Sequence, residues 1–352
     1  MKQITESPDL VVFGATSFVG KILCRYLLEE FGTRGELKWA AAGRSNAKLE
    51  ALRSSLGAQA AALPLVIADA ADEASLRKLC ASTRVVVSTV GPYALHGEPL
   101  LKACAETGTD YCDLTGEVQW IRRMLQSYEA TARKSGARIV HCCGFDSIPS
   151  DLGVHFLQRQ AMKQFGVPCT RIKMRVKAMR GGMSGGTVAS LMNVVKESAA
   201  DPALRKELAD PYSLCPAASA PKVRQPNVSS AEFDADFGAW VAPFVMSAIN
   251  TRIVLRTNAL SEQAYGAAFT YDEAMLMGRG FEGMLGAAAM TAGLAGFMLA
   301  GEIVVFSVMT AVVASLVVVP VLRATLIPMR PIAIDRVGDT TRQRDQRGAG
   351  SG

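Results

Sequence analysis

The segment DLVVFGATSFVG, residues 9–20, is the stretch that decides the fold. An apolar run ends at Gly14, and a second run begins near Phe18, in the order of a strand, a tight turn and a helix. Gly14 permits the sharp turn, and Gly20 permits the helix to pack closely on the sheet. Ser17 stands where a nucleotide-binding loop usually has another glycine. The helix start offers free amides to an anion, so the segment predicts either a dinucleotide-binding turn or a plain strand–turn–helix.

Residues 9–143 repeat this order, with short apolar runs alternating with amphipathic stretches. Such alternation is typical of βαβ units, a parallel sheet and a doubly wound α/β domain. We expect strands at Leu10–Phe13, Leu37–Ala42, Leu65–Ala68, Val85–Val90 and Arg138–Cys142. We expect helices at Val19–Glu30, Ala47–Leu56, Glu73–Ala81, Glu98–Glu106 and Val118–Lys134. The pattern predicts an N-terminal NAD(P)-binding Rossmann domain over residues 1–150.

The end of the second predicted strand indicates which dinucleotide binds. An NAD site needs an Asp or Glu there for the ribose hydroxyls, but WAAAGRSNAK places Arg44 at that point, followed by Ser45 and Lys48. A guanidinium pairs well with a phosphate that a carboxylate would repel. The predicted cofactor is therefore NADP(H), and the alternative is that Arg44 is an ordinary surface arginine. Asp69, after the third strand, either accepts from the adenine amino group or caps the next helix.

The other predicted cofactor contacts lie at the carboxyl ends of strands, where open α/β sheets bind their ligands. The full set is Gly14, Ala15, Thr16, Ser17, Phe18, Val19, Gly20, Arg44, Ser45, Asp69, Ser88, Thr89, Val90, Gly91 and Pro92. The last five come from VVVSTVGPYALHGEP and are expected near the nicotinamide. Tyr93 in the same sequence is the first candidate for a polar group over the reacting centre. His96 is either an acid or a solvated residue at a helix start.

Two further motifs carry polar residues. DYCDLTGE places Asp113, Thr115 and Glu117 in a short strand and turn, where Asp113 or Thr115 is a candidate cap for the next helix. HCCGFDSIPSDLG leaves the last strand and enters another helix. Asp146 and Ser147 in this motif lie at the predicted domain boundary and face the predicted cleft, so they join Tyr93 as catalytic candidates. Ser150 is a candidate N-cap.

The pattern changes after Pro149, and we expect a second, α+β substrate domain over residues 151–282. TRIKMRVKAM, NTRIVLRTNAL and YGAAFTYDEAM resemble strands, SGGTVASLMN resembles a turn and a helix, and residues 201–239 look irregular. The glycine-rich turn at Gly181–Thr187 is either a site for a substrate's carboxylate or phosphate or a simple connection.

Two uncharged runs follow, Gly283–Gly301 with nineteen residues and Ile303–Leu322 with twenty. Each is long enough to cross a bilayer as a helix, and Arg323 begins a basic flank of the cytoplasmic kind. The Gly and Ala content of the first run favours close packing, so buried helices over the second domain's sheet are the alternative. We expect a cytoplasmic protein attached through residues 283–322 to the cytoplasmic face of a membrane, with residues 323–352 as a basic polar tail.

Composition excludes several classes of function. The chain has 352 residues, of which 49% are hydrophobic and 20% charged, enough for about two domains. Half of the net charge of +6 comes from six Arg against three Asp after residue 322, so we expect no nucleic-acid partner. Eight cysteines without C-x-x-C spacing and three scattered histidines predict no metal site and a reducing compartment. A homo-oligomer is left open.

The motifs GATSFVG, AGRS, STVGPYALHGEPLLKAC, YCDLTGE, CGFDSIPSDLG and SGGTVASLMN together resemble the saccharopine dehydrogenase-like oxidoreductases. The similar branch includes mycobacterial trans-acting enoyl reductases and the animal saccharopine dehydrogenase-like protein, and the likeness runs from about residue 8 to about 275. It implies an N-terminal NADP-binding Rossmann domain, a mixed second domain with an apolar segment, and cofactor contacts at Gly14, Ser17, Gly20 and Arg44. The sequence departs from this family at Ser17 and after Pro328.

These observations predict an NADPH-dependent reductase of a carbon–carbon or carbon–nitrogen double bond in a hydrophobic or acyl substrate. Saccharopine-type amino-acid dehydrogenation is one alternative, although the sequence has no evident cationic cluster for an amino-diacid. A membrane-associated module that holds NADP(H) without turnover is the other, because no Tyr-x-x-x-Lys pair is evident.

Overall fold

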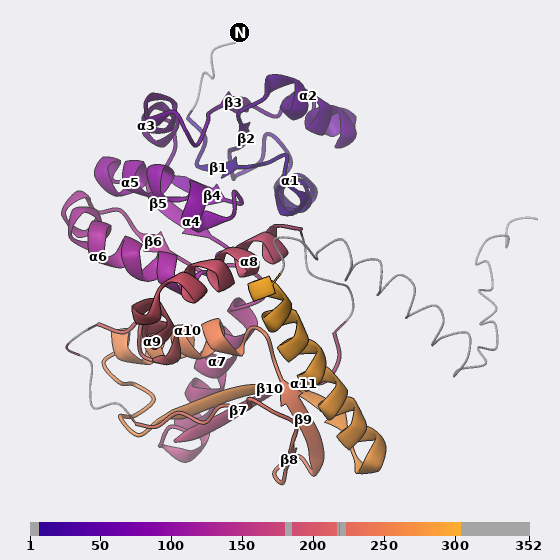
Figure 1. Cartoon of the computed structure of the whole chain (residues 1–352). Coiled ribbons are helices and arrows are strands. Elements are labelled where there is room, and N and C mark those ends of the chain that lie inside the picture. The colour runs from indigo at the N-terminus through magenta and orange to yellow at the C-terminus, as the bar shows by residue number, and fades with distance from the viewer. Residues whose placement is uncertain (1–6, 180–184, 217, 219–222, 304–352) are drawn as a thin grey trace, which may run out of the picture. The chain divides into compact units, whose positions relative to one another are not determined.

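The computed structural model describes residues 7–179, 185–216, 218 and 223–303. The chain divides into a compact unit over Met1–Glu302 and a second unit over Ile303–Gly352, of which the described residues include only Ile303. The first unit contains a six-stranded and a four-stranded sheet (Figure 1). The predicted domain boundary at residue 150 stays a prediction, and a single helix, α7, runs from Ile148 through it to Phe165.

The first sheet is parallel, with the strand order β3-β2-β1-β4-β5-β6. Its strands are β1 (Leu10–Phe13), β2 (Trp39–Gly43), β3 (Leu65–Ile67), β4 (Val85–Ser88), β5 (Asp110–Asp113) and β6 (Ile139–Val140). The order reverses at β1, which pairs with β2 on one side and β4 on the other. A ligand crevice is expected beyond the carboxyl ends of strands at such a switch point.

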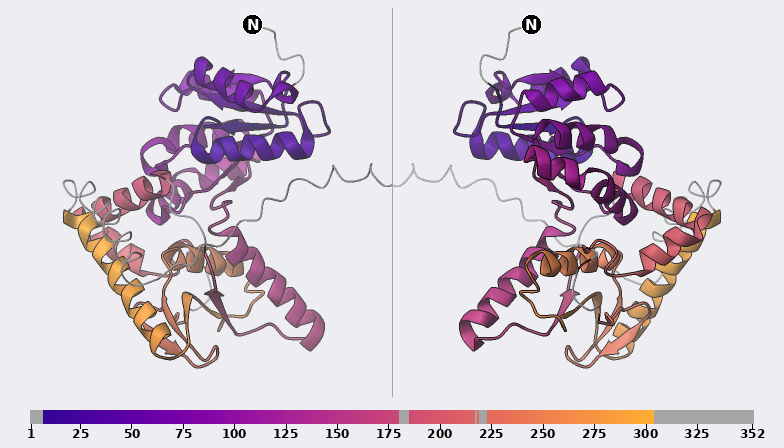
Figure 2. Two further views of the ribbon diagram at one scale, coloured as in Figure 1. Left: turned by 90° about the vertical axis from the view of Figure 1, so that its right-hand side faces the viewer. Right: turned by 90° about the vertical axis from the view of Figure 1, so that its left-hand side faces the viewer.

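Helices cover both faces of this sheet, as Figures 1 and 2 show. The helices of this part are α1 (Phe18–Phe31), α2 (Asn46–Ser55), α3 (Glu73–Ala81), α4 (Tyr93–His96), α5 (Glu98–Thr107) and α6 (Val118–Ser135), with the short 3₁₀ turn η1 (Ala58–Ala60). Val12 and Ala41 pack with α1 and α2 on one face, while Val11 and Val86 pack with α3, α5 and α6 on the other. The alternation along each strand divides one apolar sequence between two cores.

The predicted Rossmann domain is confirmed, with differences at element ends. All five predicted strands and all five predicted helices are present. The segment predicted as a short strand and turn supplies a sixth strand, β5, between β4 and β6. The last strand is shorter than predicted and covers only Ile139–Val140, because its chain then turns at Cys142, which has a left-handed φ of 60°.

The second sheet has the order β7-β10-β9-β8. Its strands are β7 (Arg171–Val176), β8 (Glu232–Asp234), β9 (Ala239–Pro243) and β10 (Thr270–Gly278). Strand β10 pairs in parallel with β7 and antiparallel with β9, so the sheet is mixed. Its accompanying helices are α7 (Ile148–Phe165), α8 (Gly185–Ala200), α9 (Pro202–Ala209), α10 (Ser247–Leu260) and α11 (Gly280–Ile303).

Two predictions in this part were wrong. NTRIVLRTNAL is not a strand but most of the helix α10, and the segment predicted to be irregular contains α9 and β8. The buried residues of α10 include polar ones, which hide the helical spacing of its apolar residues. Arg252 is the extreme case, since its guanidinium lies in the interior and donates to the carbonyls of Ala248 and Leu208.

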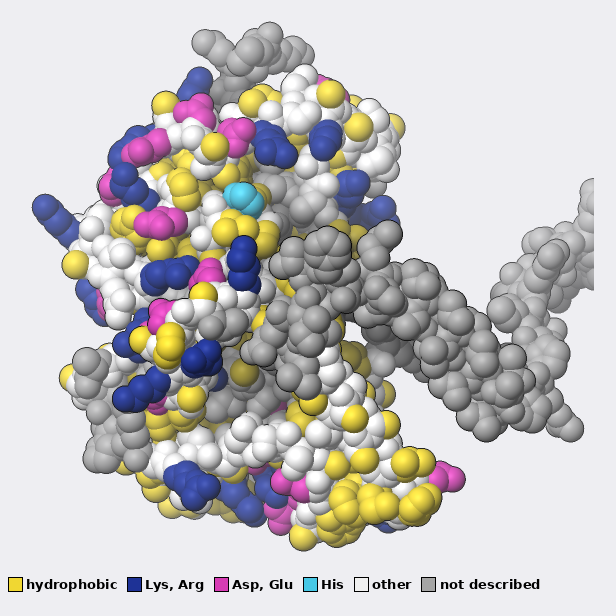
Figure 3. Space-filling view, in the orientation of Figure 1, with side chains coloured by type: hydrophobic (Ala, Val, Ile, Leu, Met, Phe, Trp, Pro, Cys, Tyr) yellow, Lys and Arg dark blue, Asp and Glu magenta, His cyan; other side chains and the backbone are white. Residues whose placement is uncertain are grey.

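The first hydrophobic run forms the helix α11, which begins against the end of β10. A Cβ on Gly283 would lie 2.3 Å from the carbonyl oxygen of Gly278, so a small residue is required at this contact. Exposed apolar side chains also gather over the first turns of α11, which lie at the lower right of Figure 3. Among the described residues, none of the helices combines the length and the apolar character needed to span a bilayer. The run Ile303–Leu322 and the tail 323–352 lie outside the described residues, apart from Ile303.

Candidate functional site

The turn between β1 and α1 depends on two glycines. Gly14 has a left-handed φ of +84°, and a Cβ there would lie 2.6 Å from the Val90 side chain. Gly20 lies in the first turn of α1, where a Cβ would come within 2.3 Å of the Gly14 carbonyl oxygen. The helix therefore starts directly against the turn, and its first N–H groups, which have no acceptor within the helix, are placed at the end of β1.

Ser17 fixes this turn where related loops often have glycine. It is the N-cap of α1, and its hydroxyl oxygen accepts from the backbone N–H of Gly20 at 2.9 Å. The same oxygen lies 3.0 Å from Oγ1 of Thr89, which itself donates to the Gly14 carbonyl at 2.9 Å. The serine thus ties the turn to the chain that leaves β4.

Arg44 follows β2 and is exposed. Its neighbour Ser45 is the N-cap of α2, and its Oγ accepts from the backbone N–H of Lys48 at 3.4 Å. Within the described ranges, no carboxylate forms an ion pair with Arg44. A free guanidinium at the end of the second strand can therefore bind an incoming phosphate without first breaking an internal contact.

The remaining predicted cofactor residues lie at the same edge of the sheet. Ala15 is buried in the turn, whereas Thr16, Phe18 and Val19 are partly or fully exposed there. Asp69 accepts from the backbone N–H of Ala71 at 3.0 Å, so its carboxylate stabilises its own turn, and the cap of α3 is Asp72. Ser88 ends β4, and the loop residues Thr89, Val90, Gly91 and Pro92 follow it beside the β1–α1 turn.

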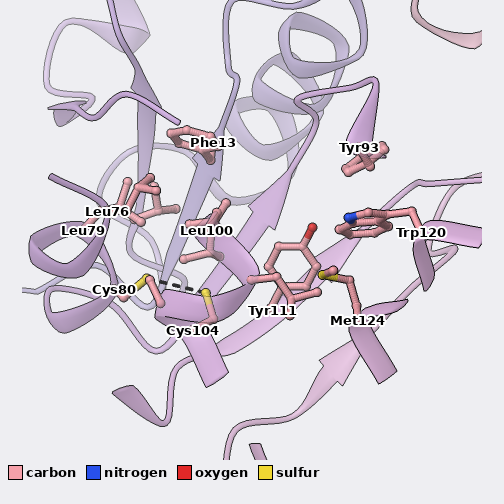
Figure 4. Close-up of a cluster of buried hydrophobic side chains, with 14 of the residues drawn as sticks. Phe13, Leu76, Leu79, Cys80, Tyr93, Leu100, Cys104, Tyr111, Trp120 and Met124 are labelled. Carbon is pink, nitrogen blue, oxygen red and sulfur yellow. Dashed lines mark hydrogen bonds between the residues drawn. The ribbon is translucent and has the colours of Figure 1, made fainter. Parts of the chain in front are cut away.

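Tyr93 is placed inside the protein rather than on the surface of the crevice. Its side chain is buried, its hydroxyl donates to the Ser88 carbonyl at 2.9 Å, and its ring lies 5.4 Å from that of Trp120 (Figure 4). Burial, with the nearby Asp113 carboxylate, raises the pKa of the phenol well above its ordinary value. The hydroxyl therefore anchors the loop that leaves β4. A direct role for Tyr93 in catalysis stays a prediction.

Glu117 was expected only near a helix start, yet its carboxylate is a central contact. It is buried, and it accepts from the backbone N–H groups of Tyr93 and Ala94, each at 2.8 Å. It also accepts from the Ser190 hydroxyl of α8 at 2.7 Å. Glu117 thereby joins the start of α4 to α8, whose Ser190 lies 73 residues after Glu117 in the sequence. Sequence reasoning missed Ser190, because the separation hides the contact.

Asp113 and His141 form a buried pair beyond β5 and β6. Oδ2 of Asp113 lies 2.7 Å from Nδ1 of His141, and Oδ1 accepts from the backbone N–H groups of Thr115 and Cys142, each at 3.1 Å. Asp113 therefore orients the imidazole and does not cap a helix. Both residues belong to motifs that the sequence analysis singled out, and adjacent parallel strands bring them together.

Asp146 and Ser147 precede α7. Asp146 is exposed, and its carbonyl accepts from Nδ2 of Asn250 at 2.9 Å. Ser147 is buried and is the N-cap residue of α7, the position that we had considered for Ser150. Nδ2 of Asn250 also contacts the buried Glu273 carboxylate at 3.0 Å, so the second sheet holds the loop that carries both catalytic candidates.

Comparison with known proteins identifies the N-terminal part. The family described as the saccharopine dehydrogenase NADP binding domain matches residues 10–140, which confirms the predicted NADP(H) cofactor. A trans-acting enoyl reductase of Mycobacterium bovis is 40% identical over 82% of this chain and 70% of its own length. A candidate trans-acting enoyl reductase of Mycobacterium tuberculosis is 42% identical over 77% of this chain. The chain spans 65% of the length of that second relative.

A solved structure of apo saccharopine dehydrogenase (L-Glu forming) from Saccharomyces cerevisiae is also similar, with 18% identity and a TM-score of 0.34. The match covers 48% of this chain and 34% of that structure. The relationship to the trans-acting enoyl reductases therefore rests on sequence identity and not on this structural similarity.

Proposed function

Because the chain belongs to the saccharopine dehydrogenase-like family that includes the trans-acting enoyl reductases, we propose that it is an NADPH-dependent reductase of an acyl substrate. The proposed reaction is reduction of a carbon–carbon double bond, with a carbon–nitrogen double bond as the alternative. When bound, NADPH supplies the hydride, and the protein supplies position and electrostatics.

The observation that carries the proposal is that Arg44, which follows β2 beside the glycine turn, has no carboxylate partner among the residues that the structure describes. A Cβ at Gly14 would lie 2.6 Å from Val90 and one at Gly20 would lie 2.3 Å from the Gly14 carbonyl oxygen, so both glycines allow the turn, the chain after β4 and the start of α1 to pack closely. This close packing supports a pyrophosphate-binding turn. Arg44 would hold the 2′-phosphate that distinguishes NADP(H) from NAD(H). Thr16, Phe18 and Val19 would face the dinucleotide from the turn, and Thr89 would fix the loop beside the nicotinamide.

Within this proposal, Tyr93 positions the β4 loop through the Ser88 carbonyl and Trp120. Asp146 is the candidate for proton transfer, since its carboxyl group is exposed and its backbone is held by Asn250. Ser147 would position the start of α7. This assignment predicts that Asp146→Asn lowers kcat and leaves NADPH affinity unchanged.

We further propose that the acyl substrate is hydrophobic. The enoyl reductase relatives support an acyl group, and the apolar C-terminal runs support a hydrophobic one. Attachment to a membrane through residues 283–322 remains a proposal, which fractionation of the full chain and of a chain lacking these residues would test. Recovery of the full chain entirely in the soluble fraction would overturn it.

The test of cofactor selection is Arg44→Ala, with Arg25→Ala as the matched control, because Arg25 is an exposed arginine on α1. A charge-assisted hydrogen bond is worth about 1.5–3 kcal/mol, so NADPH affinity should fall roughly 10- to 150-fold. NADH affinity should stay unchanged in both variants, and NADPH affinity should stay unchanged in the control. Equal losses for the two nucleotides in Arg44→Ala would overturn the assigned role of Arg44.

Turnover separates the reductase from a binding module without catalysis. Stopped-flow absorbance should record oxidation of NADPH on mixing the protein with enoyl thioesters of increasing chain length. The saturated thioester formed should be identified by mass spectrometry. Tight NADPH binding without oxidation across this series, and across a matching series of imines, would favour the binding module.

A further inference from the structure

A pocket lies at the open edge of the first sheet, beside β6. It has a volume of about 240 Å³ and lies between α5, α6, β6 and α10. None of the predicted cofactor contacts lines it, so it is separate from the glycine turn. Met124, Leu125, Ile139 and Leu260 give it apolar walls. Arg256 and His141 add polar groups to the lining. Apolar walls with a few polar groups are typical of small-molecule sites.

Arg256 of α10 brings a positive charge into these apolar walls. Burial lowers the pKa of its guanidinium, which shows that the charge is partly removed from water. Nη1 donates to the Leu214 carbonyl, and in the described part of the chain the other two guanidinium nitrogens have no hydrogen-bond partner. The nearest acid in the lining, Glu129, is already paired with Arg133 at 2.6 Å. Arg256, Arg133 and Glu129 therefore give the lining one positive charge in excess.

His141 supplies an oriented polar group to the same pocket. Its Nδ1 is held by the fully buried Asp113 carboxylate, so this nitrogen carries the proton that is donated to Asp113. Nε2 has no hydrogen-bond partner among the residues that the structure describes. The Trp120 ring packs edge-on at 5.1 Å and limits rotation of the imidazole. A ligand in the pocket would thus lie beside a fixed imidazole ring and a guanidinium.

We propose that this pocket binds a small carboxylic acid with a short hydrocarbon body. The carboxylate would pair with Arg256, and the hydrocarbon would contact Met124, Leu125 and Leu260. A cavity of about 150 Å³ holds benzene, so 240 Å³ has room for roughly ten non-hydrogen atoms. Octanoate has this size. The proposal does not rest on the reductase function, because no residue assigned to NADP(H) takes part.

The test is isothermal titration of the full chain with sodium octanoate and with 1-octanol, an uncharged molecule of similar length. We expect octanoate to bind at least tenfold more tightly than octanol. Arg256→Gln should remove this preference, while Arg84→Gln, a change of an exposed arginine that pairs with Asp9, should retain it. An absence of octanoate binding to the unaltered chain, or equal affinity for octanol, would overturn the proposal.

Arg256 also holds the Leu214 carbonyl, so a second variant guards against a loss of fold. Leu260 is half-exposed at the end of α10, and Leu260→Trp should fill the pocket while leaving Arg256 in place. It should weaken octanoate binding at least tenfold with an unchanged circular dichroism spectrum. The chain has three histidines, so nuclear magnetic resonance can resolve each ring. Octanoate should shift the His141 ring signals, and a shift confined to the other two histidines would contradict the assigned site.

Discussion

Replacing Gly20 by alanine tests the close contact between the nucleotide-binding turn and its helix. The new Cβ would lie 2.3 Å from the Gly14 carbonyl oxygen and 2.9 Å from two backbone atoms of Ala15. These are backbone atoms, so they cannot rotate away as a side chain would. Overpacking of this kind costs about 1–3 kcal/mol, and the helical preference of alanine over glycine returns about 0.5–1 kcal/mol. We therefore expect a net loss of up to about 2.5 kcal/mol in the free energy of unfolding, together with weaker NADPH binding.

The matched control is Gly153→Ala, which makes the same change inside α7. Apart from its chain neighbours and the backbone of α7 itself, no atom lies within 4 Å of the Cβ that this change would add. The control should therefore raise the free energy of unfolding by about 0.5–1 kcal/mol and leave NADPH binding unchanged. Urea unfolding followed by circular dichroism measures both variants, and fluorescence titration measures NADPH. If Gly20→Ala proves as stable as Gly153→Ala, the contact described at the turn is not the reason for glycine at this position.

Three further predictions concern buried or reactive groups. Glu117→Ala should lower the free energy of unfolding by about 3 kcal/mol or more. The N–H groups of Tyr93 and Ala94 would lose their acceptor, and each buried donor left without one costs about 1–3 kcal/mol. A thermal midpoint equal to that of the unaltered chain would contradict this prediction. Burial raises the pKa of the Glu273 carboxyl group in the folded protein. The protonated side chain therefore contributes its full stabilisation below the pKa that Glu273 has in the unfolded chain, and this stabilisation is lost as pH rises through its folded-state pKa. Glu273→Gln should flatten the decline in unfolding free energy above about pH 4.3, and an unchanged pH slope would count against the assignment. Iodoacetamide should label Cys143 before Cys24. Cys143 is exposed and a hydrogen bond with Cys112 lowers its pKa, whereas burial raises the pKa of Cys24 to about 12. Peptide mass spectrometry measures the order of labelling, and earlier labelling of Cys24 would contradict this prediction.

The Rossmann part could be predicted from sequence because its information is local. Each strand is a short apolar run, each helix has its own amphipathic spacing, and Gly14 and Gly20 mark the first turn. Strand β5 was only partly evident, because its alternating residues include Asp113, whose carboxylate is buried and satisfied by distant donors. A buried acid of this kind resembles a loop residue when only the sequence is read.

The second sheet and the contacts of the site were harder to predict because they are not local. In α10, interior positions are occupied by Asn250 and Arg252, whose hydrogen bonds reach other segments, so the apolar spacing of the helix is interrupted. The position of Tyr93 after β4 predicts a polar group over the reacting centre, and this stays a prediction, but the donation of its hydroxyl to the Ser88 carbonyl was not evident from the sequence. Neither partner could be inferred from the spacing of residues along the chain.

The carboxylate of Glu117 has a consequence for communication within the protein. It accepts at once from the first N–H groups of α4 and from Ser190 on α8. A movement of α8 that carries Ser190 away from Glu117 would break one hydrogen bond of the carboxylate that also holds the start of α4. One acidic side chain therefore couples the position of α8 to the conformation of the chain after β4.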